Sequence, residues 1–230
     1  MINLNDELKN ITLSDEQLEK FEYYYNELVE TNKVMNLTAI TKRDDVYIKH
    51  FLDSLYILNI LDKDTKYFVC DVGSGAGFPG LPLAIADNKL DITIVDSLQK
   101  RINFLNSLFL KMKMPNIHAI HARAEEYAVD HQDYFDVVTA RAVARLNILV
   151  ELCLPLVKVG GKFIAMKSNY EEELEEAKNA ITKLGGQIEK IYDYDLPYNM
   201  GRRSLIIINK VKNNPKGYPR KFAEIKKRPL

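Results

Sequence analysis

Hydrophobic residues recur at two different spacings along this 230-residue chain, and the change of spacing divides it into two parts. From about residue 14 to residue 61, apolar side chains follow the three- and four-residue spacing of amphipathic helices. Ser14 and Gln17 form a capping-box pattern before the first helix, and a second helix is predicted over residues 44–61. The region before residue 65 is therefore predicted to be a helical extension.

From Tyr67 onward, short apolar runs alternate with helical stretches. Strands are predicted at residues 67–72, 91–96, 116–122, 134–142 and 160–167. Helices are predicted from Pro79 onward and over residues 98–114, 146–157 and 171–184. Two more strands, at 186–196 and 203–211, are expected to form an antiparallel pair. The alternation predicts an α/β fold, a mainly parallel sheet with helices on both faces, whose ligands bind at the carboxyl ends of the strands.

A glycine-rich turn containing Gly73, Gly75 and Gly77 follows the first predicted strand directly. Glycines at alternate positions let the backbone turn sharply and approach a ligand without a Cβ atom in the way. The helix that follows offers unpaired N–H groups in its first turn. Asp96 ends the second predicted strand, 19 residues after Gly77, where a carboxylate can accept both hydroxyls of a ribose. The turn and Asp96 together predict a nucleotide site.

The glycines alone do not choose the cofactor, because Gly75, Gly77 and Gly80 also match the spacing of a dinucleotide-binding turn. Asp71 lies two residues before Gly73 and favours a ligand with a cationic end, such as the amino group of methionine. It would repel a pyrophosphate. The chain has no Tyr-x-x-x-Lys pair and no P-loop motif. S-adenosylmethionine is therefore the predicted cofactor, and a dinucleotide oxidoreductase is the less favoured alternative.

The composition, 47% hydrophobic and 28% charged, is ordinary for a soluble globular protein. The sequence contains no apolar run of the roughly 18 residues that a membrane span needs, and the N-terminus does not resemble a signal peptide. Cys70 and Cys153 lie far apart without a Cys-x-x-Cys pair, so no disulfide framework and no metal site are predicted. We expect a cytoplasmic protein that is monomeric and does not associate with membranes.

The charge is unevenly distributed although the net charge is zero. Residues 201–230 contain ten Lys/Arg and one acid, Glu224, whereas the first 200 residues contain 22 basic and 31 acidic groups. Such a basic segment is either a phosphate-binding surface or a solvated tail, and charge alone favours neither. The chain is accordingly divided into a helical extension (1–64), a sheet domain (65–211) and a basic tail (212–230).

Several basic residues outside this tail are expected near one edge of the predicted sheet. Arg145 and Lys167 lie near the ends of the fourth and fifth strands, and Lys100 follows Asp96 by about one helical turn. Cations contributed by separate segments can hold an RNA backbone around an extruded base. The predicted RNA-binding residues are Lys100, Arg101, Arg145, Lys167, Arg202, Arg203, Arg220 and Lys221.

The segment VCDVGSGAGFPGLPLAI resembles the first motif of class I S-adenosylmethionine-dependent methyltransferases. Its Gly-Phe-Pro-Gly continuation is similar to that of the small-subunit rRNA guanine-N7 methyltransferase family, also called glucose-inhibited division protein B. The resemblance spans nearly the whole chain in order. It continues in NLTAIT (36–41), HFLDSL (50–55), HARAEE (121–126), TARAVA (139–144) and AMKS (165–168).

This resemblance implies a Rossmann-like, seven-stranded mixed sheet and methyl transfer from S-adenosylmethionine to N7 of a guanine in 16S rRNA of the small ribosomal subunit. It also implies cofactor contacts at Gly73, Phe78, Ala124, Glu125 and Arg141. No catalytic residue is expected, because guanine N7 has a free lone pair and alignment is the main task. The alternatives are a non-catalytic RNA-binding or assembly factor that kept the fold, or a methyltransferase for another substrate.

His50 and Asp53, three residues apart on the second predicted helix, could form a metal-binding or acid–base pair. Packing of the helical extension against the sheet is the favoured interpretation. Cys70 lies in a predicted strand and Cys153 in a predicted helix, so both are interpreted as buried structural residues and not as nucleophiles.

Overall fold

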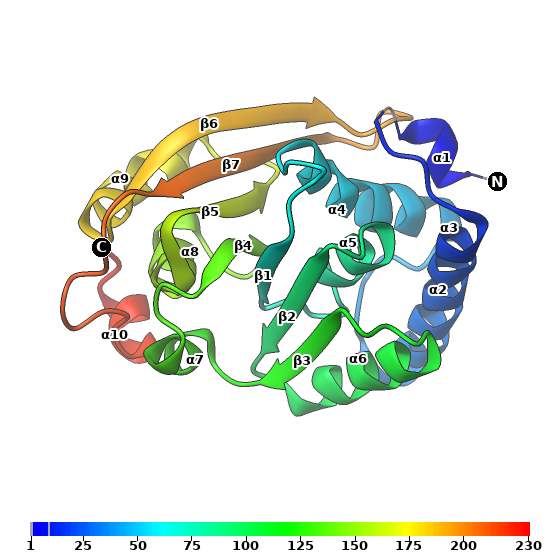
Figure 1. Ribbon diagram of the computed structural model, residues 1–230, viewed down its shortest axis with the longest axis horizontal. Helices are drawn as coiled ribbons and strands as arrows, with labels where there is room; N and C mark the ends of the chain where they lie inside the picture. The colour runs from blue at the N-terminus through cyan, green and yellow to red at the C-terminus, as the bar shows by residue number, and fades with distance from the viewer. Residues whose placement is uncertain (1, 9) are drawn as a thin grey trace.

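A seven-stranded sheet in the order β3-β2-β1-β4-β5-β7-β6 forms the centre of the computed structural model, which describes residues 2–8 and 10–230 (Figure 1). Strands β1 to β5 run parallel, and β7 is antiparallel to both β5 and β6. The predicted mixed sheet and its antiparallel pair are therefore confirmed. The strands are β1 (Tyr67–Val72), β2 (Leu90–Asp96), β3 (Ile117–His121), β4 (Phe135–Arg141), β5 (Val157–Lys167), β6 (Gly186–Asp195) and β7 (Arg202–Lys210).

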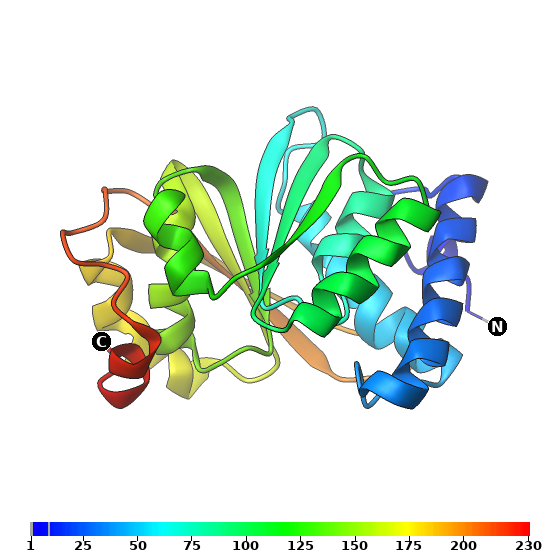
Figure 2. The ribbon, with the colours of Figure 1, turned by 90° about the horizontal axis from the view of Figure 1, so that it is seen from below.

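Alternate residues of each central strand enter two separate hydrophobic clusters, one on each face of the sheet. Val69 of β1 lies in the first cluster and its neighbour Cys70 in the second, as the two-residue repeat of a strand requires. Helices cover both faces (Figure 2). The first cluster is covered by α2 (Asp15–Met35), α4 (Asp53–Leu55), α5 (Gly80–Ala86) and α6 (Gln99–Lys111). The second is covered by α7 (Ala124–Asp130), α8 (Leu146–Cys153), α9 (Glu171–Lys183) and α10 (Phe222–Lys227).

The N-terminal helices share the first cluster with the sheet. The ring of Tyr24 lies 5.1 Å from that of Phe51 and 5.4 Å from that of Phe78, which follows the glycine turn. Tyr24 also donates a 2.7 Å hydrogen bond to the carbonyl of Ala76 within the turn. The helical extension therefore supports the predicted nucleotide loop directly. A short helix, α1 (Leu4–Glu7), precedes α2.

The helix predicted over residues 44–61 is a series of four helical segments. They are α3 (Arg43–Val46), the π-helical turn η1 (Tyr47–Leu52), α4 and the 3-10 turn η2 (Tyr56–Asn59). A π-helical turn inserts an extra residue and is frequent at functional sites. Here it buries Phe51 and Leu52 and holds His50 beside the sheet.

The basic tail is not a solvated arm throughout. It ends in α10, in which Ile225 is fully buried in the second cluster. Cys70 and Cys153 are both buried, as predicted. Among the described residues, no helix combines the length and apolar character that crossing a bilayer requires.

Candidate active site

The chain reverses its direction of travel across the sheet between β1 and β4. Strands β2 and β3 extend to one side of β1, and β4 returns to its other side. Ligands of open α/β sheets bind at the carboxyl ends of the strands at this switch point. Two adjoining cavities, of about 350 and 480 Å³, open there, and both are lined by Ala142 after β4.

The 350 Å³ cavity, called here the nucleotide cavity, begins at the glycine turn after β1. Gly73 and Gly75 have φ angles of +69° and +63°, which L side chains rarely adopt. A Cβ atom on Gly75 would meet no atom within 4 Å, so the space beside this backbone is open. A Cβ atom on Gly73 would lie 2.5 Å from the side chain of Val143, which lines the same cavity. The turn therefore lets another group approach the backbone.

Asp96 is held rigidly at the end of β2, where it lines the nucleotide cavity. Its Oδ2 accepts hydrogen bonds from the Gly75 N–H (3.0 Å) and from Arg101 Nη1 (3.2 Å). Its Oδ1 accepts one from the Leu98 N–H (2.9 Å). A carboxylate oxygen has two lone-pair sites, so Oδ1 retains one acceptor position for a ribose hydroxyl. Asp96 thus joins the glycine turn to the predicted ribose site.

The far side of the nucleotide cavity is the start of α7. Ala124 begins this helix and lines the cavity together with Glu125, the side chain of which is largely buried. Burial raises the pKa of Glu125. Of the predicted cofactor residues, Gly73, Asp96, Ala124 and Glu125 line this cavity. Residues that the sequence analysis did not single out also line it, among them Ser97, Arg123, Val143 and Phe222.

Arg141, predicted as a cofactor contact, lines the 480 Å³ cavity instead. Its guanidinium donates to Asp53 Oδ2 (3.2 Å) and to the carbonyl of Lys49 (3.1 Å). It also lies 4.8 Å from the ring centroid of Phe78. The guanidinium of Arg141 lies in this cavity because Asp53 offers a buried carboxylate on the side of the sheet that the N-terminal helices cover. Arg141 therefore joins β4 to the N-terminal helices.

The 480 Å³ cavity, called here the cationic cavity, is lined by four basic side chains from four separate elements of the chain. These are Lys49, Arg141, Lys167 and Arg203. Lys167 pairs with Glu173 at 2.6 Å, and Arg203 Nε lies 3.9 Å from Asp53 Oδ1. Tertiary structure therefore gathers Arg141, Lys167 and Arg203 next to the nucleotide cavity.

His50 and Asp53 both contribute to this cavity. The His50 ring stacks on Phe78 at 4.5 Å, and its Nε2 lies 2.9 Å from Thr38 Oγ1. Burial, with Arg141 nearby, lowers the pKa of His50 to about 3, so the ring is neutral at pH 7. Asp53 bridges Arg141 of β4 and Tyr194 of β6. His50 and Asp53 therefore attach the helical extension to the sheet. This agrees with the packing role favoured in the sequence analysis. Among the described residues, no three His, Cys, Asp or Glu side chains are grouped to hold a metal ion.

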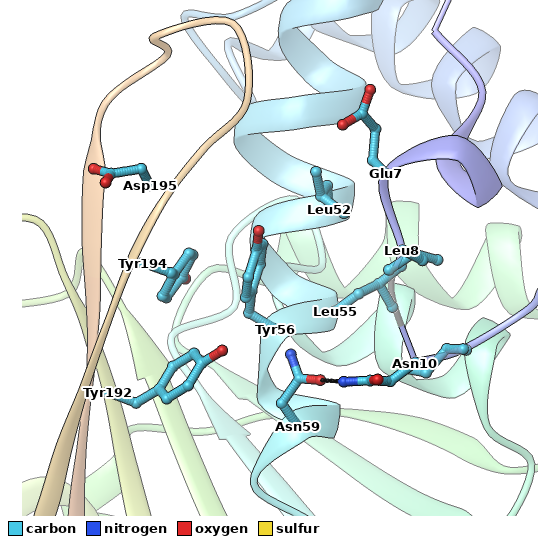
Figure 3. A pocket seen from close by; sticks show the side chains of 11 residues that line it. Glu7, Leu8, Asn10, Leu52, Leu55, Tyr56, Asn59, Tyr192, Tyr194 and Asp195 are labelled. Atoms are coloured by element: carbon cyan, nitrogen blue, oxygen red, sulfur yellow. Dashed lines mark hydrogen bonds between the residues drawn. The ribbon is translucent and has the colours of Figure 1, made fainter.

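A third cavity, of about 370 Å³, lies between the N-terminal segment, α4 and β6 (Figure 3). Tyr56 and Tyr194 stack there with centroids 3.9 Å apart, and Tyr192 lies beside them (Figure 3). Tyr194 donates a 2.8 Å hydrogen bond to Asp53 Oδ1, on the side of the cationic cavity. Tyr194 therefore separates this third cavity from the cationic cavity and helps to hold Asp53.

The other predicted RNA-binding residues are dispersed, and several are ion-paired. Arg145 forms two hydrogen bonds with Glu176 of α9, and Arg202 forms one with Asp193 of the neighbouring strand. Arg101 pairs with Asp96 and lines the nucleotide cavity, and its contact with RNA stays a prediction. Lys100 and Lys221 are exposed.

Arg220, also predicted to bind RNA, forms an ion pair with a buried carboxylate. Its guanidinium donates to both carboxylate oxygens of Glu151, at 2.8 and 2.5 Å, and Glu151 is 0% exposed. A buried carboxylate needs a charged, hydrogen-bonded partner. This cation therefore attaches the tail to α8.

Asp71, predicted to face a cationic ligand, lies behind the glycine turn and is 0% exposed. Its Oδ2 accepts a 2.7 Å hydrogen bond from the Gly80 N–H at the start of α5. Burial raises the pKa of Asp71 to about 6, although the Ser74 hydroxyl and the Gly80 N–H act in the opposite direction. The carboxylate therefore supports the start of α5 from inside the sheet, and its contact with a cationic ligand stays a prediction.

An Asp71→Asn variant is expected to change the pH dependence of stability. The unfolded chain releases the Asp71 proton near pH 3.8, whereas the folded chain holds it until about pH 6. The wild-type protein therefore loses stability as the pH rises through this window, in total about 3 kcal/mol. Asparagine does not titrate. Urea denaturation from pH 3.5 to 7.5 should show the variant gaining stability relative to wild type, and parallel curves would contradict the raised pKa.

The seven-stranded sheet with helices on both faces has the fold of class I methyltransferases. The structure is similar to that of an S-adenosylmethionine-dependent O-methyltransferase from Thermotoga maritima, with a TM-score of 0.54 at 17% identity over 82% of this chain and 73% of that one. It is also similar to M. jannaschii TYW2 in complex with AdoMet, with a TM-score of 0.53 at 16% identity over 68% and 74%.

The family model described as rRNA small subunit methyltransferase G matches residues 17–198. The chain is 50% identical to ribosomal RNA small subunit methyltransferase G of Ligilactobacillus salivarius, over 96% of this chain and 95% of that protein. It is also 50% identical to the protein of the same name from Staphylococcus carnosus, over 96% and 94%. The chain belongs to the rRNA small subunit methyltransferase G family.

Proposed function

We propose that this protein transfers a methyl group from S-adenosylmethionine to N7 of a guanine in 16S rRNA of the small ribosomal subunit. The observation that carries the proposal is the pair of adjoining cavities. One is lined by a glycine turn and by Asp96, and the other by four cations, and they meet at Ala142. Family membership supports rRNA as the substrate.

The residues of the nucleotide cavity fit the cofactor. The open side of Gly75, the remaining acceptor position on Asp96 and the start of α7 suit a ribose and a base. S-adenosylmethionine would supply a methyl group on a positively charged sulfur. Gly73, Asp96, Ala124 and Glu125 would hold and orient it, and the junction at Ala142 would direct its reactive end toward the cationic cavity.

The chemistry of guanine N7 matches the side chains of the cationic cavity. N7 carries a lone pair at neutral pH, so no proton has to leave before the methyl group is transferred. His50 is neutral and half-buried, and both of its ring nitrogens lie within hydrogen-bond distance of other groups. Lys49, Arg141, Lys167 and Arg203 would bind the phosphates flanking the guanine. Catalysis would then rest on alignment.

The test is tritium transfer from labelled S-adenosylmethionine to small ribosomal subunits, or to their rRNA, from a strain that lacks this protein. Label is expected in 7-methylguanosine, identified by mass spectrometry. Cofactor binding without label in any rRNA nucleoside would point to another substrate. If the protein neither binds S-adenosylmethionine nor transfers label, it is the non-catalytic RNA-binding protein.

An Arg203→Ala variant is expected to raise the KM for rRNA about tenfold, because one desolvated phosphate contact is lost. Affinity for S-adenosylmethionine should stay within twofold, since Arg203 does not line the nucleotide cavity. Arg202→Ala is the matched control, because Arg202 is exposed and pairs with Asp193. Equal KM values for the two variants would show that the cationic cavity does not bind the substrate.

A further inference from the structure

The C-terminal helix α10 contributes a side chain to the nucleotide cavity. Phe222, the first residue of α10, is half-buried and lines this cavity, whereas every other lining residue lies between Val72 and Leu152. The guanidinium carbon of Arg123, which also lines the cavity, is 6.0 Å from the Phe222 ring centroid. The segment interpreted from sequence as a basic tail thus supplies an aromatic wall.

Two contacts hold this wall in place, one on each side of Phe222. Before it, Arg220 binds the buried carboxylate of Glu151 through its guanidinium and also through its backbone N–H at 3.1 Å. After it, Ile225 is 0% exposed within the cluster under α8. Glu151 directly precedes Leu152, another residue that lines the cavity. The attachment of the tail is therefore built into the cavity wall itself.

The position of α10 indicates which part of a ligand it meets. α10 lies on the face of the sheet covered by α7, α8 and α9 (Figure 1, Figure 2). Phe222 lines the nucleotide cavity and not the cationic cavity, which joins it at Ala142. The transferred methyl group must reach that junction, and Asp96 suits the ribose. The part of the cofactor that lies beyond the ribose is the adenine.

We propose that Phe222 contacts the adenine of S-adenosylmethionine, and that residues 218–228 form a wall of the cofactor site. This inference rests on the proposed function. A flat apolar ring suits the face or edge of a base, and base–aromatic contacts contribute measurably to affinity. The basic residues of α10, Lys226 and Lys227, remain exposed on its outer surface. The tail therefore serves the cofactor through its aromatic side.

The experiment measures S-adenosylmethionine binding to full-length variants by isothermal titration calorimetry. Phe222→Ala is expected to weaken binding about tenfold, the loss of one base–aromatic contact. The same factor is expected for 5′-methylthioadenosine, which keeps the adenine and lacks the amino-acid end. Phe222→Tyr, which keeps the ring, should bind within threefold of wild type. Lys226→Ala, a change on the exposed side of the same helix, is the matched control.

A second variant tests the attachment of the tail. Arg220→Ala combined with Glu151→Leu removes the ion pair without leaving a buried carboxylate, and it is expected to weaken cofactor binding although Arg220 does not line the cavity. Wild-type affinity in both Phe222→Ala and this double variant would overturn the inference and leave the proposed function intact. A wild-type protein that does not bind S-adenosylmethionine would overturn both.

Discussion

An Asp96→Ala variant is expected to bind S-adenosylmethionine roughly tenfold to a hundredfold more weakly than the wild-type protein. The change removes the one acceptor position that remains on Asp96 Oδ1 for a ribose hydroxyl, and a hydrogen bond to a charged group contributes about 1.5–3 kcal/mol. One such bond corresponds to a factor of about 10 to 100 in affinity. The change also frees the Gly75 N–H and Arg101, which Asp96 now holds at 3.0 and 3.2 Å. Calorimetric titration of each protein measures the loss.

The matched control for this prediction is Asp91→Ala. Asp91 lies near the start of the same strand, is exposed, and its Oδ1 lies 3.9 Å from His118 Nε2. Its removal should leave cofactor affinity within twofold. An Asp96→Ala protein that is folded and binds within threefold of wild type would show that the ribose does not lie at Asp96.

An Arg220→Ala variant is expected to lose about 3–5 kcal/mol of unfolding free energy. The substitution leaves the Glu151 carboxylate, which is 0% exposed, without its two guanidinium hydrogen bonds. For a chain of this length the loss corresponds to a fall in Tm of roughly 10 °C. Differential scanning calorimetry together with urea denaturation measures both quantities.

Two comparisons separate this effect from a general loss of tail charge. Lys221→Ala removes the adjacent, exposed cation and should change the unfolding free energy by less than about 0.5 kcal/mol. Adding Glu151→Leu to Arg220→Ala should recover most of the lost stability, because no buried charge then remains. A single variant as stable as wild type would mean that Arg220 is not the partner that Glu151 requires.

Local patterns predicted the sheet domain well. The first strand begins at Tyr67 and the second ends at Asp96, both as predicted. The helix predicted over 98–114 is observed at Gln99–Lys111. The predicted and observed bounds differ by up to four residues, as at the end of the helix predicted over 146–157, which ends at Cys153. The reason is that helix ends depend on capping and packing contacts that the hydrophobic pattern does not contain. The π-helical turn at Tyr47–Leu52 was not predicted, since its apolar spacing also fits an α-helix.

The sequence by itself determined the order of the seven strands along the chain and the chemistry of the glycine turn and Asp96. These features depend on residues that are close together in the chain. Only the tertiary structure decided the partners of the cations. Arg141 meets Asp53 across 88 residues, and Arg220 meets Glu151 across 69. A charge selects its partner by burial and distance in space, which spacing along the chain does not encode. For this reason the sequence did not predict that Arg141 and Arg220, which it assigned to ligands, also connect distant parts of the fold.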